Sequence, residues 1–187
     1  MRQINVGVIG AGWCGGIRAN TSAENPLVND LHIAEIDPVR LEEVSAETHA
    51  ASATTDYWEL LRIDDLDAVF ISATPEHTHY PMAKDSLEAG KHVLLEKPIS
   101  LTLAEADELI DLARKSNLKF TIGYSQRFNP KFAYARKSLR DGRIGRPSAP
   151  LSAGTSRAAW EIRSAAAASC RRPSWRPPTT STSSFGA

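Results

Sequence analysis

The sequence has few cysteines, no excess charge of either sign and no long apolar run. Its two cysteines, Cys14 and Cys170, have neither the spacing of a zinc site nor the number needed for a disulfide framework. The 22 basic residues balance the 22 acidic ones, which gives no electrostatic reason to expect nucleic acid or a membrane surface as a partner. No stretch approaches the roughly 18 apolar residues of a membrane span, and we expect no cleavable leader. These absences predict a soluble, cytoplasmic protein.

The amino-acid composition is not uniform along the chain and changes near Pro147. Residues 147–187 contain no lysine and one acid, Glu161, and consist mainly of serine, alanine, arginine, proline and threonine. Such a segment cannot bury enough apolar surface to offset the entropy of ordering it. We therefore expect the folded part to lie within residues 1–146, followed by a disordered, low-complexity tail.

Strand-like and helix-like patterns alternate along residues 1–124. Apolar, β-branched runs predict strands at 4–9, 31–37, 67–74, 91–98 and 119–124. Helical patterns lie between them at 16–24, 38–50, 80–90 and 100–117. The last of these begins with the capping-box spacing of Thr102 and Glu105. This order predicts an α/β fold: a doubly wound, mostly parallel sheet with helices on both faces.

A glycine-rich turn follows the first predicted strand. Gly10, Gly12 and Gly15 form G-x-G-x-x-G, in which the glycines permit a tight turn, close approach of a pyrophosphate, and close packing of helix on strand. Asp37 ends the second predicted strand, where a carboxylate can accept hydrogen bonds from ribose hydroxyls and repel a 2′-phosphate. A plain strand-to-helix turn is the alternative, but the βαβ context favours a dinucleotide, and Asp37 favours NAD over NADP.

Several side chains near this turn have more than one interpretation. Trp13 and Cys14 occupy its variable positions and are predicted cofactor-binding residues. Cys14 fits a reactive thiol at a helix start, although a packed small side chain is favoured. His77 and His79 form an i, i+2 pair without a further ligand, so we predict no metal.

Lys97 follows a predicted strand at the end where ligands gather in open parallel sheets. A lysine there can hydrogen-bond a substrate hydroxyl and stabilise charge on its oxygen during hydride transfer. Sequence physics alone slightly favours a plain surface lysine in a strand-to-loop turn.

Four ordered motifs resemble a known family. "GAGWCG", "TPEHTHY", "EAGKHVLLEKP" and "GYSQRFNP" resemble the glucose–fructose oxidoreductase / inositol dehydrogenase (Gfo/Idh/MocA) family over about residues 3–146. The resemblance implies a Rossmann domain at 1–122. It also implies a second α/β domain, starting at 123–146, that forms the substrate wall and usually an oligomer interface.

The resemblance assigns roles residue by residue. It places a pyrophosphate along Gly10, Gly12 and Gly15, and the adenosine ribose at Asp37. The loop beneath the nicotinamide matches Thr74, Pro75 and His79. The E-K-P motif matches Glu96, Lys97 and Pro98; its lysine contacts the reacting hydroxyl as the catalytic residue, and its Lys–Pro bond is often cis. The substrate-side segment that leads into the second domain matches Arg127, Asn129 and Pro130.

The family pattern breaks after residue 146. Family members continue into a domain whose helix usually carries an acid–base histidine, whereas residues 147–187 contain no histidine. This segment fits a disordered tail, or weakly an Arg/Trp arm for nucleic acid. A third hypothesis, that this segment is read out of frame, explains it better. If each codon is taken to start at the third base of the codon before it, the codons from Cys170 onward permit a helix that contains a His-Asp pair. We therefore favour a frameshift near Pro147.

Three functions compete. The first is an NAD-dependent oxidoreductase that transfers hydride between nicotinamide and a carbinol carbon of a sugar, cyclitol or related polyol. The second is a nucleotide-binding fragment without turnover, because the acid–base half is absent from this chain. The third is a sugar- or cofactor-sensing regulator, which would not need the E-K-P motif. A homo-oligomer is expected only with the second domain restored.

Overall fold

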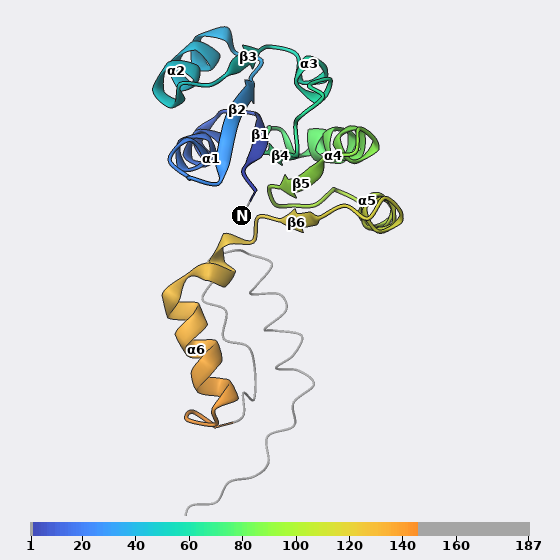
Figure 1. The fold of residues 1–187 in the computed structure, drawn as a ribbon. Helices are drawn as coiled ribbons and strands as arrows, with labels where there is room; N and C mark the ends of the chain where they lie inside the picture. The colour runs from blue at the N-terminus through green and yellow to red at the C-terminus, as the bar shows by residue number, and fades with distance from the viewer. Residues whose placement is uncertain (1, 146–187) are drawn as a thin grey trace, which may run out of the picture. The chain divides into compact units, whose positions relative to one another are not determined.

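A computed structural model describes residues 2–145 (Figure 1). The described residues up to Phe132 form one compact unit, and those from Ala133 onward belong to a second. The predicted division of domains at residues 122 and 123 stays a prediction. The predicted disorder and frameshift of residues 147–187 lie outside the described residues.

The first unit is built on a six-stranded parallel sheet in the order β3-β2-β1-β4-β5-β6. Central strand β1 pairs with β2 on one side and β4 on the other, so that Val8 lies opposite both Ile33 and Phe70. The order reverses at β1, which confirms the predicted doubly wound α/β fold. The strands are β1 (Ile4–Ile9), β2 (Val28–Ala34), β3 (Ser52–Thr54), β4 (Ala68–Ile71), β5 (His92–Leu95) and β6 (Phe120–Ile122).

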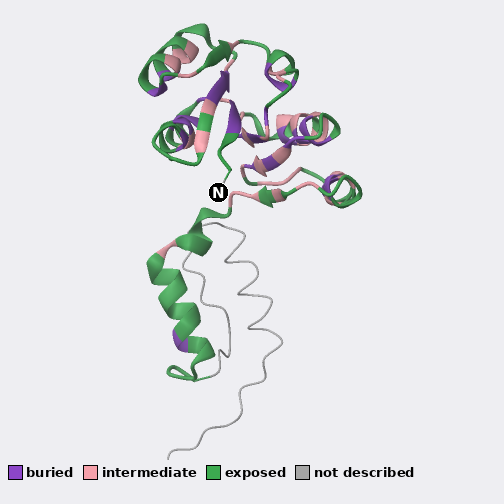
Figure 2. Cartoon of the chain, in the orientation of Figure 1, coloured by how far each residue is buried: buried purple, intermediate pink, exposed green. Residues whose placement is uncertain are grey.

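Helices cover both faces of this sheet. Helices α1 (Trp13–Ala23) and α2 (Pro38–Thr48) lie on one side, and α3 (Tyr57–Leu61), α4 (His79–Glu88) and α5 (Leu103–Lys115) on the other (Figure 1). Each side has its own apolar cluster. Val6, Val8 and Val44 belong to the first, and Ile71, Leu95 and Leu109 to the second. Figure 2 shows the buried residues gathered on the strands and on the sheet-facing sides of the helices.

Local signals explain where several helices begin and end. Thr102 and Glu105 form the predicted capping box at the start of α5. Pro38 occupies the first turn of α2, where its missing N–H has no partner to lose. Gly90, with φ +76°, follows α4 in a conformation that favours glycine.

The structure moves some predicted boundaries. Strand β2 ends at Ala34, so the predicted strand end at Asp37 is three residues too late. Strand β3 and helix α3 are additional elements of three and five residues. Two short 3₁₀ turns, η1 (Glu76–Thr78) and η2 (Ser125–Phe128), and helix α6 (Pro130–Arg140) complete the chain order. Of the described residues, no helix is long and apolar enough to cross a membrane.

Candidate functional site

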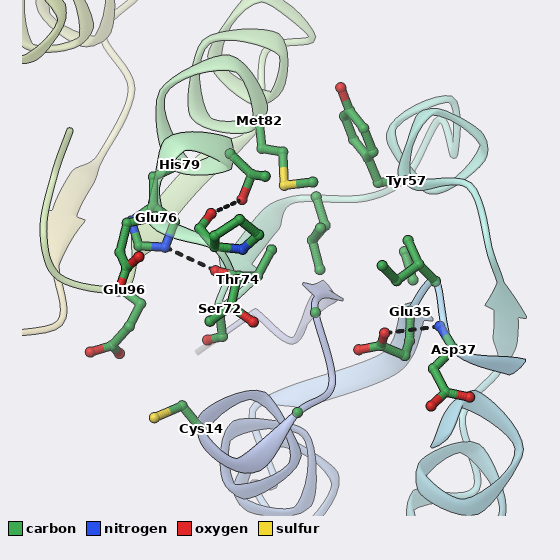
Figure 3. A pocket seen from close by; sticks show the side chains of 18 of the residues that line it. Cys14, Glu35, Asp37, Tyr57, Ser72, Thr74, Glu76, His79, Met82 and Glu96 are labelled. Carbon is green, nitrogen blue, oxygen red and sulfur yellow. Dashed lines mark hydrogen bonds between the residues drawn. The ribbon is translucent and has the colours of Figure 1, made fainter. Parts of the chain in front are cut away.

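A cavity of about 690 Å³ lies where β1, β2, β4 and β5 end (Figure 3). Most of the predicted cofactor-binding residues line it: Gly10, Gly12, Trp13, Cys14, Asp37, Thr74, Pro75, His79, Glu96 and Lys97. Parallel strands place their carboxyl ends at one edge of a sheet, and a crevice opens there because the connections that follow the neighbouring strands β1 and β4 lead to opposite faces of the sheet. The fold thus brings together motifs from far apart in the sequence.

The glycine turn forms the floor of this cavity, and each glycine has a different reason to lack a side chain. Gly10 has φ +81°, and a Cβ there would lie 2.6 Å from backbone atoms of Ala73. A Cβ on Gly15 would lie 1.7 Å from the carbonyl oxygen of Gly10, so helix α1 could not pack against the strand end. Gly12 is the opposite case, because a Cβ there would meet no atom within 4 Å. Gly15 thus shapes the turn from beneath, while Gly12 borders open space.

The N-terminus of α1 faces the same cavity and, among the described residues, has no side-chain cap and no acid in its first turn. The first N–H groups of a helix lack intrahelical partners and carry partial positive charge, which attracts anions. Trp13 is 82% exposed there, and Cys14 is half-buried with its side chain at the cavity (Figure 3).

One end of the cavity carries two carboxylates that follow β2. Glu35 accepts hydrogen bonds from the backbone N–H of Ala11 at 2.6 Å and of Asp37 at 3.1 Å. The carboxylate of Asp37 instead accepts from Val39 N at 3.0 Å and caps helix α2. Glu35 is therefore the acid that directly follows the strand end, and sequence analysis missed it because the strand was extended to Asp37.

The other end of the cavity is formed by the loop after β4. The peptide bonds Thr74–Pro75 and Lys97–Pro98 are both cis. His79 is 1% exposed, and its ring joins the two loops: Nδ1 lies 2.7 Å from the carbonyl oxygen of Pro98 and Nε2 lies 3.0 Å from that of Ala73. The side chain of His79 thus supports both proline-containing turns from behind.

Tyr57 and Met82 form part of the wall between these ends (Figure 3). Burial, reinforced by a hydrogen bond from the phenol to Asp85 at 2.8 Å, raises the pKa of Tyr57. Tyr57 therefore stays protonated at neutral pH and presents an uncharged wall. Helix α3 supplies Tyr57, and sequence analysis missed that helix because five residues are too few to show a periodicity.

Lys97 belongs to two cavities. A second cavity, of about 470 Å³, is lined by Lys97 and by residues 123–127. The predicted substrate-side residue Arg127 is in this lining. Asn129 lies outside both linings among the described residues; its amide donates to Gln126 Oε1 at 3.1 Å, and its oxygen accepts from Lys131 N at 3.0 Å.

Residues 2–145 contain no group of three or more histidine, cysteine, aspartate or glutamate side chains that could hold a metal ion. The cavity nevertheless has a strong charge pattern. Glu35 and Asp37 lie at one end, Glu76 and Glu96 at the other, and the glycine turn between them (Figure 3). Arg40 and Lys97 also line the cavity, so these two cations and the N-terminus of α1 are the favourable partners for an anion there.

Comparison with known proteins identifies the same architecture. Residues 4–124 match the GFO_IDH_MocA family, described as an oxidoreductase family with an NAD-binding Rossmann fold. The chain is 31% identical over 155 residues to levoglucosan dehydrogenase of Pseudarthrobacter phenanthrenivorans, covering 78% of this chain and 39% of that one. It is 31% identical over 147 residues to myo-inositol 2-dehydrogenase of Thermotoga maritima, covering 77% of this chain and 43% of that one.

A solved structure is similar in fold as well. The scyllo-inositol dehydrogenase of Lactobacillus casei, crystallised with bound NAD(H) and scyllo-inositol, superposes with a TM-score of 0.72 at 29% identity, over 77% of this chain and 43% of that one. The chain thus spans about two fifths of the length of the curated relatives that it matches.

Proposed function

This chain belongs to the Gfo/Idh/MocA oxidoreductase family with its NAD-binding Rossmann fold, and on that premise we propose that its larger cavity binds NAD(H) and that Lys97 serves hydride transfer between the nicotinamide and a carbinol carbon of a polyol. The observation that carries the proposal is the convergence of the glycine turn, the acid after β2 and the E-K-P turn on one cavity. Substrates of this kind are sugars, cyclitols or related polyols.

The glycine turn suits a pyrophosphate for steric and electrostatic reasons. The space beside Gly12 is open, so backbone can approach a ligand there. The N-terminus of α1 points N–H groups at the same space, and the described residues place no acid in its first turn. This pattern supports the predicted roles of Gly10, Gly12, Trp13 and Cys14 around the phosphates, while Gly15 acts through packing.

Glu35 is the better candidate for the adenosine ribose. Its carboxylate has acceptor capacity beyond its two backbone hydrogen bonds. It also lies twenty positions after Gly15, the spacing expected of a ribose-binding acid. The carboxylate of Asp37 is occupied as a helix cap, which favours a structural role over the ribose contact predicted for it.

The same end of the cavity favours NAD over NADP. Glu35 would repel a 2′-phosphate. Arg40 also lines the cavity; it donates from Nε to the carbonyl oxygen of Ala11 at 2.9 Å and from Nη1 to Glu43 at 3.1 Å, so two of its donor nitrogens are already engaged. A 2′-phosphate would therefore meet the carboxylate of Glu35 and a guanidinium whose Nε and Nη1 already have partners.

Lys97 lies where the two cavities meet, which supports a role between cofactor and substrate. Its ammonium group can donate hydrogen bonds to a substrate hydroxyl and stabilise negative charge on that oxygen. Bound NAD supplies the hydride acceptor. Thr74, Pro75 and His79 form the wall beside Lys97, and Arg127 extends the substrate side.

A nucleotide-binding fragment without turnover is the second candidate; residues 1–187 span about two fifths of the length of these curated relatives. The family resemblance implies an acid–base histidine in a second domain, so in residues 1–187 taken alone Lys97 would hold a substrate oxygen with no assigned group to take its proton. The complete oxidoreductase, its cytoplasmic location and any homo-oligomer remain proposals about the family protein.

One titration separates these functions. We expect the chain to enhance and shift NADH fluorescence on binding. Addition of NAD with myo-inositol or levoglucosan produces an NADH absorbance change only if the chain turns over. Lys97→Met should retain NADH binding and reduce any turnover by about two to three orders of magnitude. Binding without turnover supports the fragment, and absence of NADH binding contradicts both functions.

A pair of variants tests the assignment of the ribose acid. Glu35→Gln keeps a hydrogen-bond acceptor but removes the charge, so we expect the NADPH-to-NADH affinity ratio to rise about tenfold. Asp37→Asn keeps the helix cap and should leave the ratio unchanged. A larger change in Asp37→Asn than in Glu35→Gln would restore Asp37 as the ribose acid.

A further inference from the structure

Arg18 on helix α1 forms the most buried ion pair of the described residues. Its Nη2 pairs with Glu96 Oε2, and its Nε donates to the hydroxyl of Ser72 at 3.1 Å. The two charged side chains are only 22% and 15% exposed, and Ser72 is buried. Surface ion pairs contribute little because water screens them, whereas a pair at this depth leaves a costly charge behind when one partner is lost.

The guanidinium group connects the ends of β4 and β5 to α1 and lies beside the end of β6. Ser72 directly follows β4, Glu96 directly follows β5, and Gly123 directly follows β6. A Cβ on Gly123 would lie 2.7 Å from Arg18 Nη2 and 2.9 Å from Glu96 Oε2. The ion pair therefore occupies the space that a side chain at position 123 would fill.

This ion pair lies at the E-K-P turn, beside the larger cavity. Glu96 lines that cavity next to Lys97, at the end opposite Glu35. Without Arg18, its carboxylate would face the cavity with no cation bonded to it. An unpaired charge in such a partly buried space repels a nearby phosphate more strongly than it would in bulk water.

We propose that Arg18 is a positioning residue for the nicotinamide half of the site: by pairing with Glu96 and bonding to Ser72, it holds the turn that carries Lys97 against helix α1 and keeps an unpaired carboxylate out of the cavity. This inference rests on the proposed binding of NAD(H). Because α1 also supplies the phosphate-facing N-terminus, Arg18 joins the two parts of the site within one rigid helix.

The geometry predicts that loss of Arg18 weakens the binding of only one half of the dinucleotide. No hydrogen bond or ion pair joins Arg18 to Glu35, whose carboxylate accepts from the backbone N–H of Ala11 and of Asp37. The adenosine end should therefore be indifferent to Arg18, while the pyrophosphate and nicotinamide end should depend on it. AMP and NADH are accordingly the two probes that separate this role from a general loss of structure.

The experiment uses the full chain with four variants: Arg18→Met, Glu96→Gln, the double variant, and Arg2→Met as a matched control. Arg2 pairs with Asp67 at 2.8 Å, neither residue lines the cavity, and 80% of the Arg2 side chain is exposed. Dissociation constants for NADH and AMP are measured by calorimetry, together with stability by urea unfolding.

We expect Arg18→Met to weaken the binding of NADH about tenfold or more and the binding of AMP less than about twofold. Adding Glu96→Gln should restore most of the NADH affinity, to within about threefold of the wild type, because the unpaired charge is gone while the link between the turn and α1 is still missing. Arg2→Met should change neither affinity. Equal losses for NADH and AMP, or no loss for NADH, would overturn the role of Arg18.

Two further results keep the test decisive. If Arg18→Met does not fold, Arg18→Lys replaces it. The single ammonium group of lysine cannot bond to Ser72 and Glu96 at the same time as the forked guanidinium does, so the affinity for NADH should fall about threefold while the affinity for AMP does not change. Unaltered NADH affinity in Arg18→Lys would then overturn the proposal. If the wild-type chain binds no NADH, the proposed function itself is refuted. The results for the variants, by contrast, test only the role of Arg18.

Discussion

The turn after β1 and the turn after β5 line the same cavity but are built in different ways. The first turn depends on missing side chains: a Cβ on Gly10 or Gly15 would collide with backbone atoms, which cannot move aside. The second turn depends on side chains that are present, since Arg18, Glu96 and His79 hold it through an ion pair and hydrogen bonds. The first turn is thus specified mainly by shape, with added hydrogen bonds from the N–H of Ala11 to Glu35 and from Arg40 to the carbonyl oxygen of Ala11, and the second by charge and hydrogen bonding.

This difference has consequences for tolerance to substitution. Backbone contacts leave no room for adjustment, so a shape-determined turn should fail abruptly. Side-chain tips can swing away, so a charge-determined turn should degrade by steps and should respond to compensating changes. The following predictions test that contrast.

The largest effect should come from Gly15→Ala, with Gly12→Ala as its matched control. The new Cβ at position 15 would lie 1.7 Å from the Gly10 carbonyl oxygen, so we expect a loss of at least about 3 kcal/mol in the free energy of unfolding, or failure to fold. At position 12 the space is open, so stability should stay within about 0.5 kcal/mol while NADH affinity falls about tenfold. Urea unfolding and NADH titration measure both; similar stabilities of the two variants would refute the distinction.

A smaller effect is expected from Gly123→Ala beside the charge-determined turn. The new Cβ would approach the tips of Arg18 and Glu96, which can shift, so the cost should be about 1–2 kcal/mol and below that of Gly15→Ala. In an Arg18→Met background the added cost should shrink, because less of the ion pair remains to be displaced. A cost that is independent of Arg18 in urea unfolding would show that this turn is also specified by backbone shape.

The smallest effect concerns a histidine that belongs to neither turn and does not line the cavity. Burial lowers the pKa of His32, against opposing contributions from Asp30 and Asp65, and its Nδ1 lies 2.8 Å from Ser52 Oγ. The folded chain therefore binds this proton less readily than the unfolded chain. Its contribution to stability is present above the ordinary value of 6.5 and is lost as the pH falls below it.

His32→Gln tests this dependence. Urea unfolding is measured at about pH 7.5 and about pH 5.5. Between these values the free energy of unfolding should fall more for the wild type than for His32→Gln, by a few tenths to about 1 kcal/mol. Titration of the other histidines is common to both proteins and cancels in the comparison. NADH affinity should be unaffected by the substitution, because His32 is not among the residues that line the cavity; identical pH dependence in the two proteins would contradict the assignment.

The parts of the fold that sequence predicted well are those with strong local signals. Strand β1 matches its prediction because a continuous apolar, β-branched run ends at a glycine. The capping box at α5 was readable because both of its members lie within four residues. Strand β3, with the sequence SAT, has no apolar run or alternation that would predict a strand. It is stabilised by its pairing with β2 rather than by local propensity.

The candidate site shows the same limit. Its glycine turn and its E-K-P turn were readable as motifs, and the cavity brings most of their residues together. Glu35 was missed because a strand boundary was misplaced by three residues, although its spacing from Gly15 was a usable signal. Arg18 had no such signal, because its partner Glu96 lies 78 residues away and only the folded sheet brings them together.

The sheet ends on both sides in a strand of only three residues, β3 and β6. An outer strand exposes unpaired N–H and C=O groups that can recruit a strand from another molecule, and shortness is one way in which proteins limit this recruitment. The longer strands β1 and β2 are each paired on both sides. The apolar strands that would best seed aggregation are thus kept away from the edges of the sheet.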